Sequence, residues 1–134
     1  MTLGVRAVVL DSEQRVFLVK HSYISGWHLP GGGVETGETM LRALRRELAE
    51  EGRIELAGEP ELFGIYLNSH VSSRDHMALY VVRHFTQDRK PEPNREIIDC
   101  GFFGTGALPP ETTMGTRLRI AEVVEKKPPF QTWR

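Results

Sequence analysis

The fold of this chain is decided by residues 31–54, GGGVETGETMLRALRRELAEEGRI, which join a glycine-rich stretch to an acidic cluster. Four glycines fall within the first seven positions, and Glu-Leu-Ala-Glu-Glu follows at 47–51. From Thr39 to Glu51 the segment lacks glycine and proline and is rich in good helix formers. It therefore predicts a flexible loop followed by a helix.

The helical period places acidic side chains where an apolar stripe is expected. At about 100° per residue, the predicted buried stripe consists of Met40, Leu41, Leu44 and Leu48. Glu51 falls about 20° from Leu44, inside this stripe, and Glu47 falls about 60° away, on its edge. The opposite side carries arginines, as a solvated face would: Arg42, Arg45 and Arg46.

Carboxylates at Glu47, Glu50 and Glu51 are spaced so that they would repel one another, and at least one points where a side chain should be dry. A cation is expected to neutralise them. Hard oxygen ligands grouped in this way suit magnesium or manganese, which would also take phosphate oxygens as ligands. The alternative is an ordinary acidic helix face exposed to solvent.

The glycines predict the matching half of such a site. Gly31, Gly32 and Gly33 can expose backbone N–H and C=O groups with no side chain in the way. The free amides of the helix that follows favour an anion such as phosphate. A tight turn between a strand and a helix would explain the glycines equally well, so this pattern alone leaves both interpretations open.

Bulk composition narrows the class of protein. The chain has 134 residues, of which 40% are hydrophobic and 26% charged, and its formal net charge is -1. This predicts one globular domain over residues 1–134 and argues against non-specific binding to duplex nucleic acid or anionic membranes. The single Cys100 cannot form an internal disulfide, so we expect a cytoplasmic protein. The first residues predict a strand, with no targeting segment.

Strand-like runs surround the central segment. Apolar runs at 3–10 and 16–20 flank a polar turn and predict a hairpin, and runs at 61–70 and 76–85 predict an antiparallel pair. A further short strand is expected at 96–103 and a last helix at 116–126. The interleaved elements predict an α/β fold with a central mixed sheet and helices on its faces.

The central segment resembles the signature of the Nudix hydrolases. That signature is Gly, five residues, Glu, seven residues, Arg-Glu, an aliphatic residue, any residue, Glu-Glu, any residue, Gly and an aliphatic residue. The matching positions here are Gly32, Glu38, Arg46, Glu47, Leu48, Glu50, Glu51 and Ile54. One position departs, because Arg53 replaces the last glycine, which normally ends the helix in a left-handed conformation.

The resemblance implies an α/β/α sandwich and hydrolysis of a nucleoside diphosphate linked to another group, X. It implies that divalent metals are held by the carbonyl of Gly31 and by Glu47, Glu50 and Glu51. Arg46 would orient these carboxylates, and Glu38 would support the loop. For Arg53 there are two outcomes: Gly52 ends the helix one residue early, or Arg53 carries about 1 kcal/mol of strain.

The expected chemistry is in-line attack on phosphorus by a water that the metal acidifies. Glu50 or Glu47 is the nearest candidate for taking the proton from this water, and some family members use a glutamate from a later loop, for which Glu96 is the candidate here, with Asp99 behind it. Gly32 and Gly33 are expected to contact the phosphates.

Two further residues are candidates for substrate binding. Arg6 interrupts an apolar strand, so it is either an edge-facing residue or a phosphate ligand, and we favour the ligand. Trp27 either packs in the core, the more frequent role, or stacks on the nucleobase. The histidines show no zinc-like spacing with Cys100. Subfamily markers are absent, so the substrate range extends from nucleoside triphosphates to nucleotide sugars.

Two other function classes remain open at this level. One is a catalytically silent Nudix-fold module that senses a nucleotide, an idea raised by Arg53. The other is a structural protein whose acidic helix is merely solvated. The terminal KKPPFQTWR is compatible with covering an apolar patch, with contacting a homodimer partner or with fraying, and Trp133 favours docking.

Overall fold

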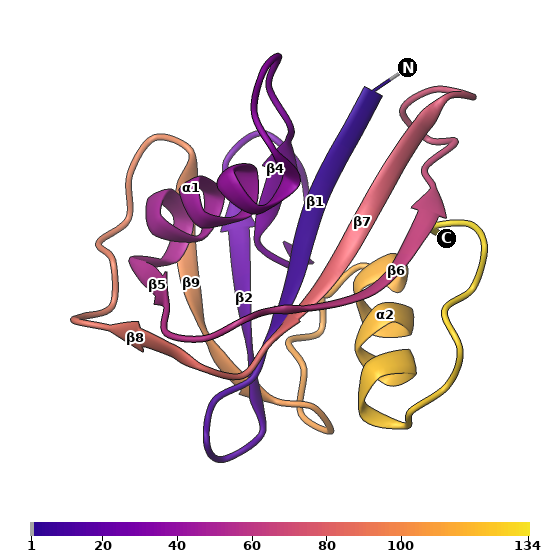
Figure 1. Ribbon diagram of the computed structural model, residues 1–134. Coiled ribbons are helices and arrows are strands. Elements are labelled where there is room, and N and C mark those ends of the chain that lie inside the picture. The colour runs from indigo at the N-terminus through magenta and orange to yellow at the C-terminus, as the bar shows by residue number, and fades with distance from the viewer. Residues whose placement is uncertain (1) are drawn as a thin grey trace.

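The computed structural model describes residues 2–134 and contains nine strands and two helices within them (Figure 1). A four-stranded mixed sheet has the order β4-β1-β7-β6, formed by Gly31–Gly33, Thr2–Val9, Asp75–Val82 and Glu61–Leu67. A second sheet has the order β3-β2-β9, formed by Trp27–His28, Arg15–His21 and Ile97–Gly104. A short pair joins β5 and β8, formed by Ile54–Leu56 and Phe85–Gln87.

The expected mixed sheet is confirmed, because β1 runs parallel to β7 and antiparallel to β4. The antiparallel pair predicted downstream is also confirmed, as β6 and β7. The strand expected at 96–103 is β9, and it pairs with β2. In Figure 1, β2 and β9 lie side by side near α1, and β1 runs alongside β7.

Alternating side chains on the central strands build two cores on opposite faces. On β1, Val5, Ala7 and Val9 belong to the cluster that includes Leu44 of α1, whereas Val8 belongs to the cluster that includes Ile120 of α2. This follows from the two-residue period of a strand that is buried on both faces. The α/β/α arrangement is thus confirmed by burial as well as by topology.

The predicted hairpin at the N-terminus is corrected by the structure. The turn exists, because the N–H of Asp11 donates to the carbonyl of Arg15 at 3.0 Å and Leu10 bridges Val16. Beyond it, however, β1 enters the first sheet and β2 enters the second. Both strands are buried on two faces, so their partners are chosen by packing across the domain and not by nearness in sequence.

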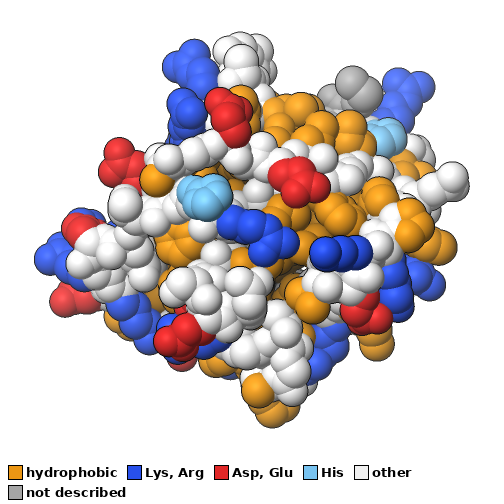
Figure 2. Space-filling view, turned by 60° about the horizontal axis from the view of Figure 1, so that its bottom comes forward, with side chains coloured by type: hydrophobic (Ala, Val, Ile, Leu, Met, Phe, Trp, Pro, Cys, Tyr) orange, Lys and Arg blue, Asp and Glu red, His pale blue; other side chains and the backbone are white. Residues whose placement is uncertain are grey.

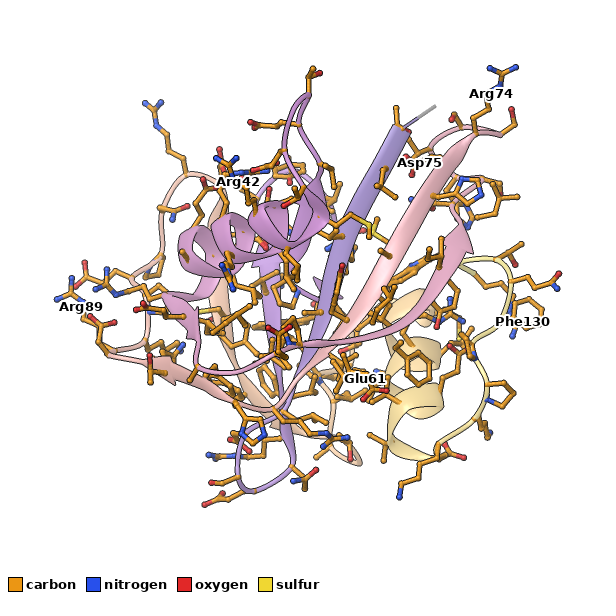
Figure 3. All side chains as sticks on the ribbon, viewed as in Figure 1. Arg42, Glu61, Arg74, Asp75, Arg89 and Phe130 are labelled. Carbon is orange, nitrogen blue, oxygen red and sulfur yellow. The ribbon has the colours of Figure 1, made fainter. Side chains whose placement is uncertain are left out.

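Both predicted helices are present with shifted ends. Helix α1 spans Met40–Gly52 and α2 spans Met114–Val124, against expectations of 39–51 and 116–126. Thr39 and Thr113 cap their N-termini through side-chain oxygens that accept from the N–H three residues on. Arg42, labelled in Figure 3, is exposed and points away from the sheet, as the helical period predicted.

The C-terminal segment docks on the edge of the first sheet. The N–H of Leu67 donates to Gln131 at 2.8 Å, and the N–H of Trp133 donates to Leu67 at 2.9 Å. The Trp133 ring lies edge-on to Tyr66, with centroids 5.5 Å apart. This confirms docking as the preferred interpretation of Trp133. On the face shown in Figure 2, positive and negative side chains are interspersed, in keeping with the balanced net charge.

Candidate active site

The inward orientation of Glu51 is confirmed. This residue is 7% exposed, and one carboxylate oxygen accepts a hydrogen bond from the N–H of Gly31 at 2.7 Å. Burial raises the pKa of Glu51 to about 8, and the neighbouring charge of Glu47 adds to the rise. A buried acid with this pKa is the most perturbed carboxyl group of the site.

Glu51 has little cationic compensation from the described chain. Across residues 2–134, its only partner within ion-pair distance is His21, with 3.8 Å between Nε2 and Oε2. Desolvation lowers the pKa of His21 to about 4, so this imidazole is neutral at pH 7. The carboxylate of Glu51 therefore lies in an environment that calls for a further positive charge.

The three glycines form strand β4 and not the expected loop. Gly31 pairs with Arg6, and a Cβ at Gly31 would lie 2.0 Å from the carbonyl oxygen of Val5. A Cβ at Gly32 would lie 2.5 Å from Oε1 of Glu47. Only glycine permits this approach, because any side chain would push β4 away from β1 or displace the carboxylate of Glu47.

The glycines do not lead directly into the first turn of α1, as the expected phosphate site assumed. Residues 34–39 separate β4 from α1, and the first turn is capped by Thr39. The glycines instead face the later turns of α1, where Gly31 contacts Glu51 and the carbonyl of Gly33 accepts from Arg46 at 3.1 Å. Backbone groups and carboxylates therefore meet beside the middle and end of the helix.

Arg46 connects the acidic residues of the segment. Its Nε donates to Glu38 at 2.8 Å, and its Nη1 donates to Glu47 at 2.8 Å. The hydrogen bonds from Arg46 lower the pKa of Glu38 to about 2. The helical period alone predicted a solvated Arg46, and the structure shows that it is paired instead. It contacts Glu47, one of the carboxylates that the resemblance expected it to orient, and that role stays a prediction.

Arg6 is the side chain that the sequence analysis favoured as a phosphate ligand. It is half-buried on β1, and its guanidinium donates to the carbonyl of Leu29. Desolvation lowers the pKa of Arg6, while the charge of Glu51 acts in the opposite direction, which shows that the two groups lie close together. Its role as a phosphate ligand stays a prediction.

The candidates for the general base lie at different depths. Glu50 is exposed on α1, with its carboxylate 3.9 Å from Nη1 of Arg46, whereas Glu47 is half-buried and burial raises its pKa. Glu96 is exposed just before β9, and its carbonyl accepts from the N–H of Ser22 at 2.8 Å. The carboxylate of Asp99 points to Lys90 at 3.7 Å, on the adjoining surface.

Trp27 lies in the core and not on an accessible surface. It is 9% exposed, and its ring lies edge-on to Phe103 with centroids 5.1 Å apart. This placement corrects the weaker expectation that Trp27 stacks on a base. The exposed aromatic of the same segment is Tyr23, at 69% exposure, which the sequence analysis did not single out. A tyrosine among polar loop residues gives no periodic signal.

Arg53 takes the left-handed conformation that the signature glycine normally supplies. Its φ is 53° and its ψ 35°, and its N–H donates back to Ala49 at 3.1 Å. Its Nε also donates to Asp88 at 2.9 Å. Gly52 does not end the helix early; a Cβ there would lie 2.9 Å from the ring of Phe17, so packing requires this glycine. The second of the two predicted outcomes for Arg53 is the one observed.

The donor set fits a divalent metal, although the side chains do not yet converge. Among residues 2–134, no three acidic, histidine or cysteine side chains meet at one point as a ligand group. Glu47 is engaged by Arg46 and Glu51 by Gly31, while Glu50 extends outward. Binding would require Glu47 and Glu50 to turn toward Glu51, whose buried and weakly compensated carboxylate supplies the attraction.

Comparison with known proteins shows which family shares this architecture. The MutT NUDIX hydrolase from Burkholderia pseudomallei has a solved structure that is similar to this one, with a TM-score of 0.76 and 26% identity. The match covers 91% of this chain and 97% of that one. The fold is therefore that of the Nudix hydrolases. The NUDIX domain family model matches residues 1–123, and the chain belongs to this family.

Curated relatives match over shorter regions. An RNA pyrophosphohydrolase from Francisella tularensis is 47% identical over 48 residues, which cover 36% of this chain and 31% of that protein. A putative 8-oxo-dGTP diphosphatase from Bacillus subtilis is 33% identical over 76 residues, which cover 57% of this chain and 50% of that protein. The matched regions thus span 31% and 50% of the length of these two relatives. Among its described residues, neither helix is long and apolar enough to cross a membrane.

Proposed function

We propose that this protein is a diphosphohydrolase that uses a divalent metal, magnesium or manganese, to cleave the pyrophosphate bond of a nucleoside diphosphate linked to a group X. The observation that carries the proposal is Glu51, a carboxylate 7% exposed beside Glu47, with a pKa raised to about 8 and only a neutral histidine in ion-pair range. Such a group is costly unless a cation binds it.

Each residue of the site has a distinct part in this proposal. Glu47, Glu50, Glu51 and the carbonyl of Gly31 would hold the metal, which supplies charge neutralisation and an acidified water when bound. Arg46 keeps Glu47 and Glu38 in place through its hydrogen bonds. Arg6 and the backbone of Gly32 and Gly33 would contact the phosphate oxygens.

The proton of the attacking water needs an acceptor at the mouth of the site. Glu50 is exposed and lies on the same flank of α1 as Glu47, so it can reach water without leaving the helix face. Glu96 approaches from the other side, because Ser22 ties its backbone to the end of β2. We favour Glu50, with Glu47 and Glu96 as alternatives that the same assay separates.

The substrate class is a nucleotide that carries a pyrophosphate bond. The curated relatives are named for a pyrophosphohydrolase acting on RNA and a diphosphatase acting on 8-oxo-dGTP, which supports cleavage between phosphates. Because the matches cover no more than half of either relative, they do not choose between a polynucleotide end and a free nucleotide.

The oligomeric state is a separate question, and a homodimer stays a prediction.

A panel of nucleoside triphosphates, nucleotide sugars and a 5′-triphosphorylated oligonucleotide, each with magnesium, tests the proposal. We expect release of phosphate, pyrophosphate or nucleoside monophosphate from at least one of them, with oxygen from ¹⁸O-labelled water found on a phosphate product. Glu50→Gln should lower turnover at least about a hundredfold. The control is Glu61→Gln, an exposed glutamate on β6 labelled in Figure 3, which should retain full activity.

The outcomes separate the proposal from its alternatives. Release from none of the compounds, with nucleotide binding intact, would leave a nucleotide-sensing module as the better account. An unchanged rate in Glu50→Gln would remove Glu50 from the mechanism, and Glu47→Gln and Glu96→Gln would then identify the base.

A further inference from the structure

An exposed aromatic side chain lies at the rim of the acidic site. Tyr23 belongs to the connection between β2 and β3 and is 69% exposed, the highest exposure among the large hydrophobic side chains of residues 2–134. A tyrosine that buries so little of its ring contributes little to the stability of the fold. Its position beside the site makes the exposed ring available to a ligand.

Two contacts define the position of Tyr23. Its ring centroid lies 5.0 Å from that of His21, whose Nε2 is 3.8 Å from a carboxylate oxygen of Glu51. The next residue back, Ser22, donates its N–H to the carbonyl of Glu96 at 2.8 Å. Tyr23 is therefore held between the carboxylates of α1 and the segment that carries Glu96.

A second aromatic ring extends the same surface. The His28 ring lies 5.8 Å from that of His21, and its Nε2 is 3.0 Å from the carbonyl of Ser25. Tyr23 and His28 thus both pack against the buried ring of His21. We call the group of Tyr23, His21 and His28 the aromatic shelf.

We propose that the aromatic shelf binds the nucleobase of the substrate, with the exposed face of Tyr23 as the stacking surface. The inference rests on the proposed function, because it assigns the part of the substrate that lies beyond the pyrophosphate. A base stacked on Tyr23 would leave its phosphates beside Glu51 and Arg6, since His21 bridges Tyr23 and the carboxylate. Stacking is tolerant of base identity, because every base presents a flat π face.

The test compares Tyr23→Ala with Tyr23→Phe, which keeps the ring and loses only the hydroxyl. The substrate is the nucleoside triphosphate hydrolysed fastest in the panel above. We expect Tyr23→Ala to raise KM about tenfold or more while kcat changes less than about threefold, and Tyr23→Phe to stay within about twofold of wild type. Ile24→Ala, a change at the neighbouring residue with 40% exposure, is the matched control.

A ligand without a base separates base binding from a general disturbance of the site. The inhibition constant of inorganic tripolyphosphate should be the same in wild type, Tyr23→Ala and Tyr23→Phe. The inference is overturned if KM for the nucleotide is unchanged in Tyr23→Ala, or if the inhibition constant of tripolyphosphate rises in parallel with KM.

A binding measurement keeps this inference distinct from the proposed hydrolysis. Calorimetric titration with a non-hydrolysable α,β-methylene nucleoside diphosphate in manganese should give a dissociation constant about tenfold weaker in Tyr23→Ala. If the wild type binds the analogue with this dependence on Tyr23 but cleaves nothing, the aromatic shelf stands and the hydrolase proposal fails. If wild type and Tyr23→Ala bind equally, or if neither binds, the shelf is wrong.

Discussion

Two buried glutamates, Glu51 on α1 and Glu122 on α2, have nearly equal exposure and opposite surroundings. They are 7% and 8% exposed, respectively. Glu122 accepts hydrogen bonds from the hydroxyl of Tyr66 at 2.7 Å, from Arg119 at 3.1 Å and from the N–H of Phe130 at 3.3 Å. Within residues 2–134, Glu51 accepts one hydrogen bond, from the N–H of Gly31.

The difference contrasts a structural acid with the acid that the proposed function assigns to the metal. Arg119 is fully buried, lies over the rings of Tyr66 and Trp133 and neutralises Glu122, so this cluster locks α2 and the C-terminal segment to β6. The environment of Glu51 leaves its charge largely uncompensated and raises its pKa to about 8. A buried acid with so little compensation is the group that the proposed metal would bind.

The largest effect is expected from breaking the compensated cluster. Arg119→Met removes the cation and leaves Glu122 buried without its charge partner, which should cost about 3–5 kcal/mol of unfolding free energy. Urea unfolding measures this loss. The control is Arg42→Met on the exposed side of α1, expected to change stability by less than about 0.5 kcal/mol. If Arg119→Met loses as little unfolding free energy as Arg42→Met, the cluster does not lock α2.

Glu51→Gln should give the opposite result. The amide keeps the shape of the side chain and removes the charge, so nucleotide hydrolysis should fall at least about a hundredfold while stability in metal-free buffer is kept or improved. Initial rates and urea unfolding in a chelator measure the two quantities. A large loss of stability with retained activity would reverse the roles assigned to Glu51 and Glu122.

The pH dependence of stability sharpens the same contrast. Because the folded-state pKa of Glu51, about 8, exceeds its ordinary value of 4.5, the folded state binds more protons between these values. Its contribution to stability is therefore full below about pH 4.5 and is lost as pH rises through 8. Unfolding in a chelator at several pH values should show this decline in wild type and a shallower one in Glu51→Gln. Equal slopes would contradict it.

A smaller effect is expected from crowding Glu47. The Cβ of Gly32→Ala would lie 2.5 Å from Oε1 of Glu47, so this carboxylate must move and turnover should fall roughly tenfold or more. Gly106→Ala is the control, since a Cβ there meets nothing within 4 Å and Gly106 has no part in the proposed site. Equal rates for the two variants would show that the position of Glu47 is not critical.

The smallest effect concerns the departure from the family signature. Arg53 has a φ of 53°, so Arg53→Gly should relieve strain and raise the unfolding free energy by about 0.5–1 kcal/mol, with activity within about twofold of wild type. Arg53→Ala keeps the Cβ and loses the contact with Asp88, so it should be no more stable than wild type. Stabilisation by both substitutions would place the strain elsewhere.

The features that follow local rules were predictable from the sequence. The 3.6-residue period placed Glu51 on the buried side of α1, and two-residue alternation placed strand residues in the core. The features that the sequence did not predict depend on contacts between residues that lie far apart in the chain. Strand β1 pairs with β7 instead of β2. Gly31–Gly33 form a strand because they pair with β1. Arg119 contacts Glu122, Tyr66 and Trp133 in a cluster that requires the C-terminal segment to dock.

The aromatic residues show the same limit. Trp27 and Tyr23 lie four positions apart, and Trp27 was predicted either to pack in the core, the more frequent role, or to stack on a base. The structure buries Trp27 against Phe103 and leaves Tyr23 exposed beside His21. Which ring faces solvent depends on how the segment 22–30 packs against β9 and the residues before α2, and this packing has no signature in the local sequence.

The most direct test is the unfolding free energy at pH 8 as a function of magnesium concentration, in wild type and in Glu51→Gln. If a divalent cation compensates Glu51, the wild type should gain stability as the logarithm of magnesium concentration above its dissociation constant, and the variant should gain little. Equal gains in the two proteins, or no gain in either, would contradict the claim that this buried carboxylate is there to hold a metal.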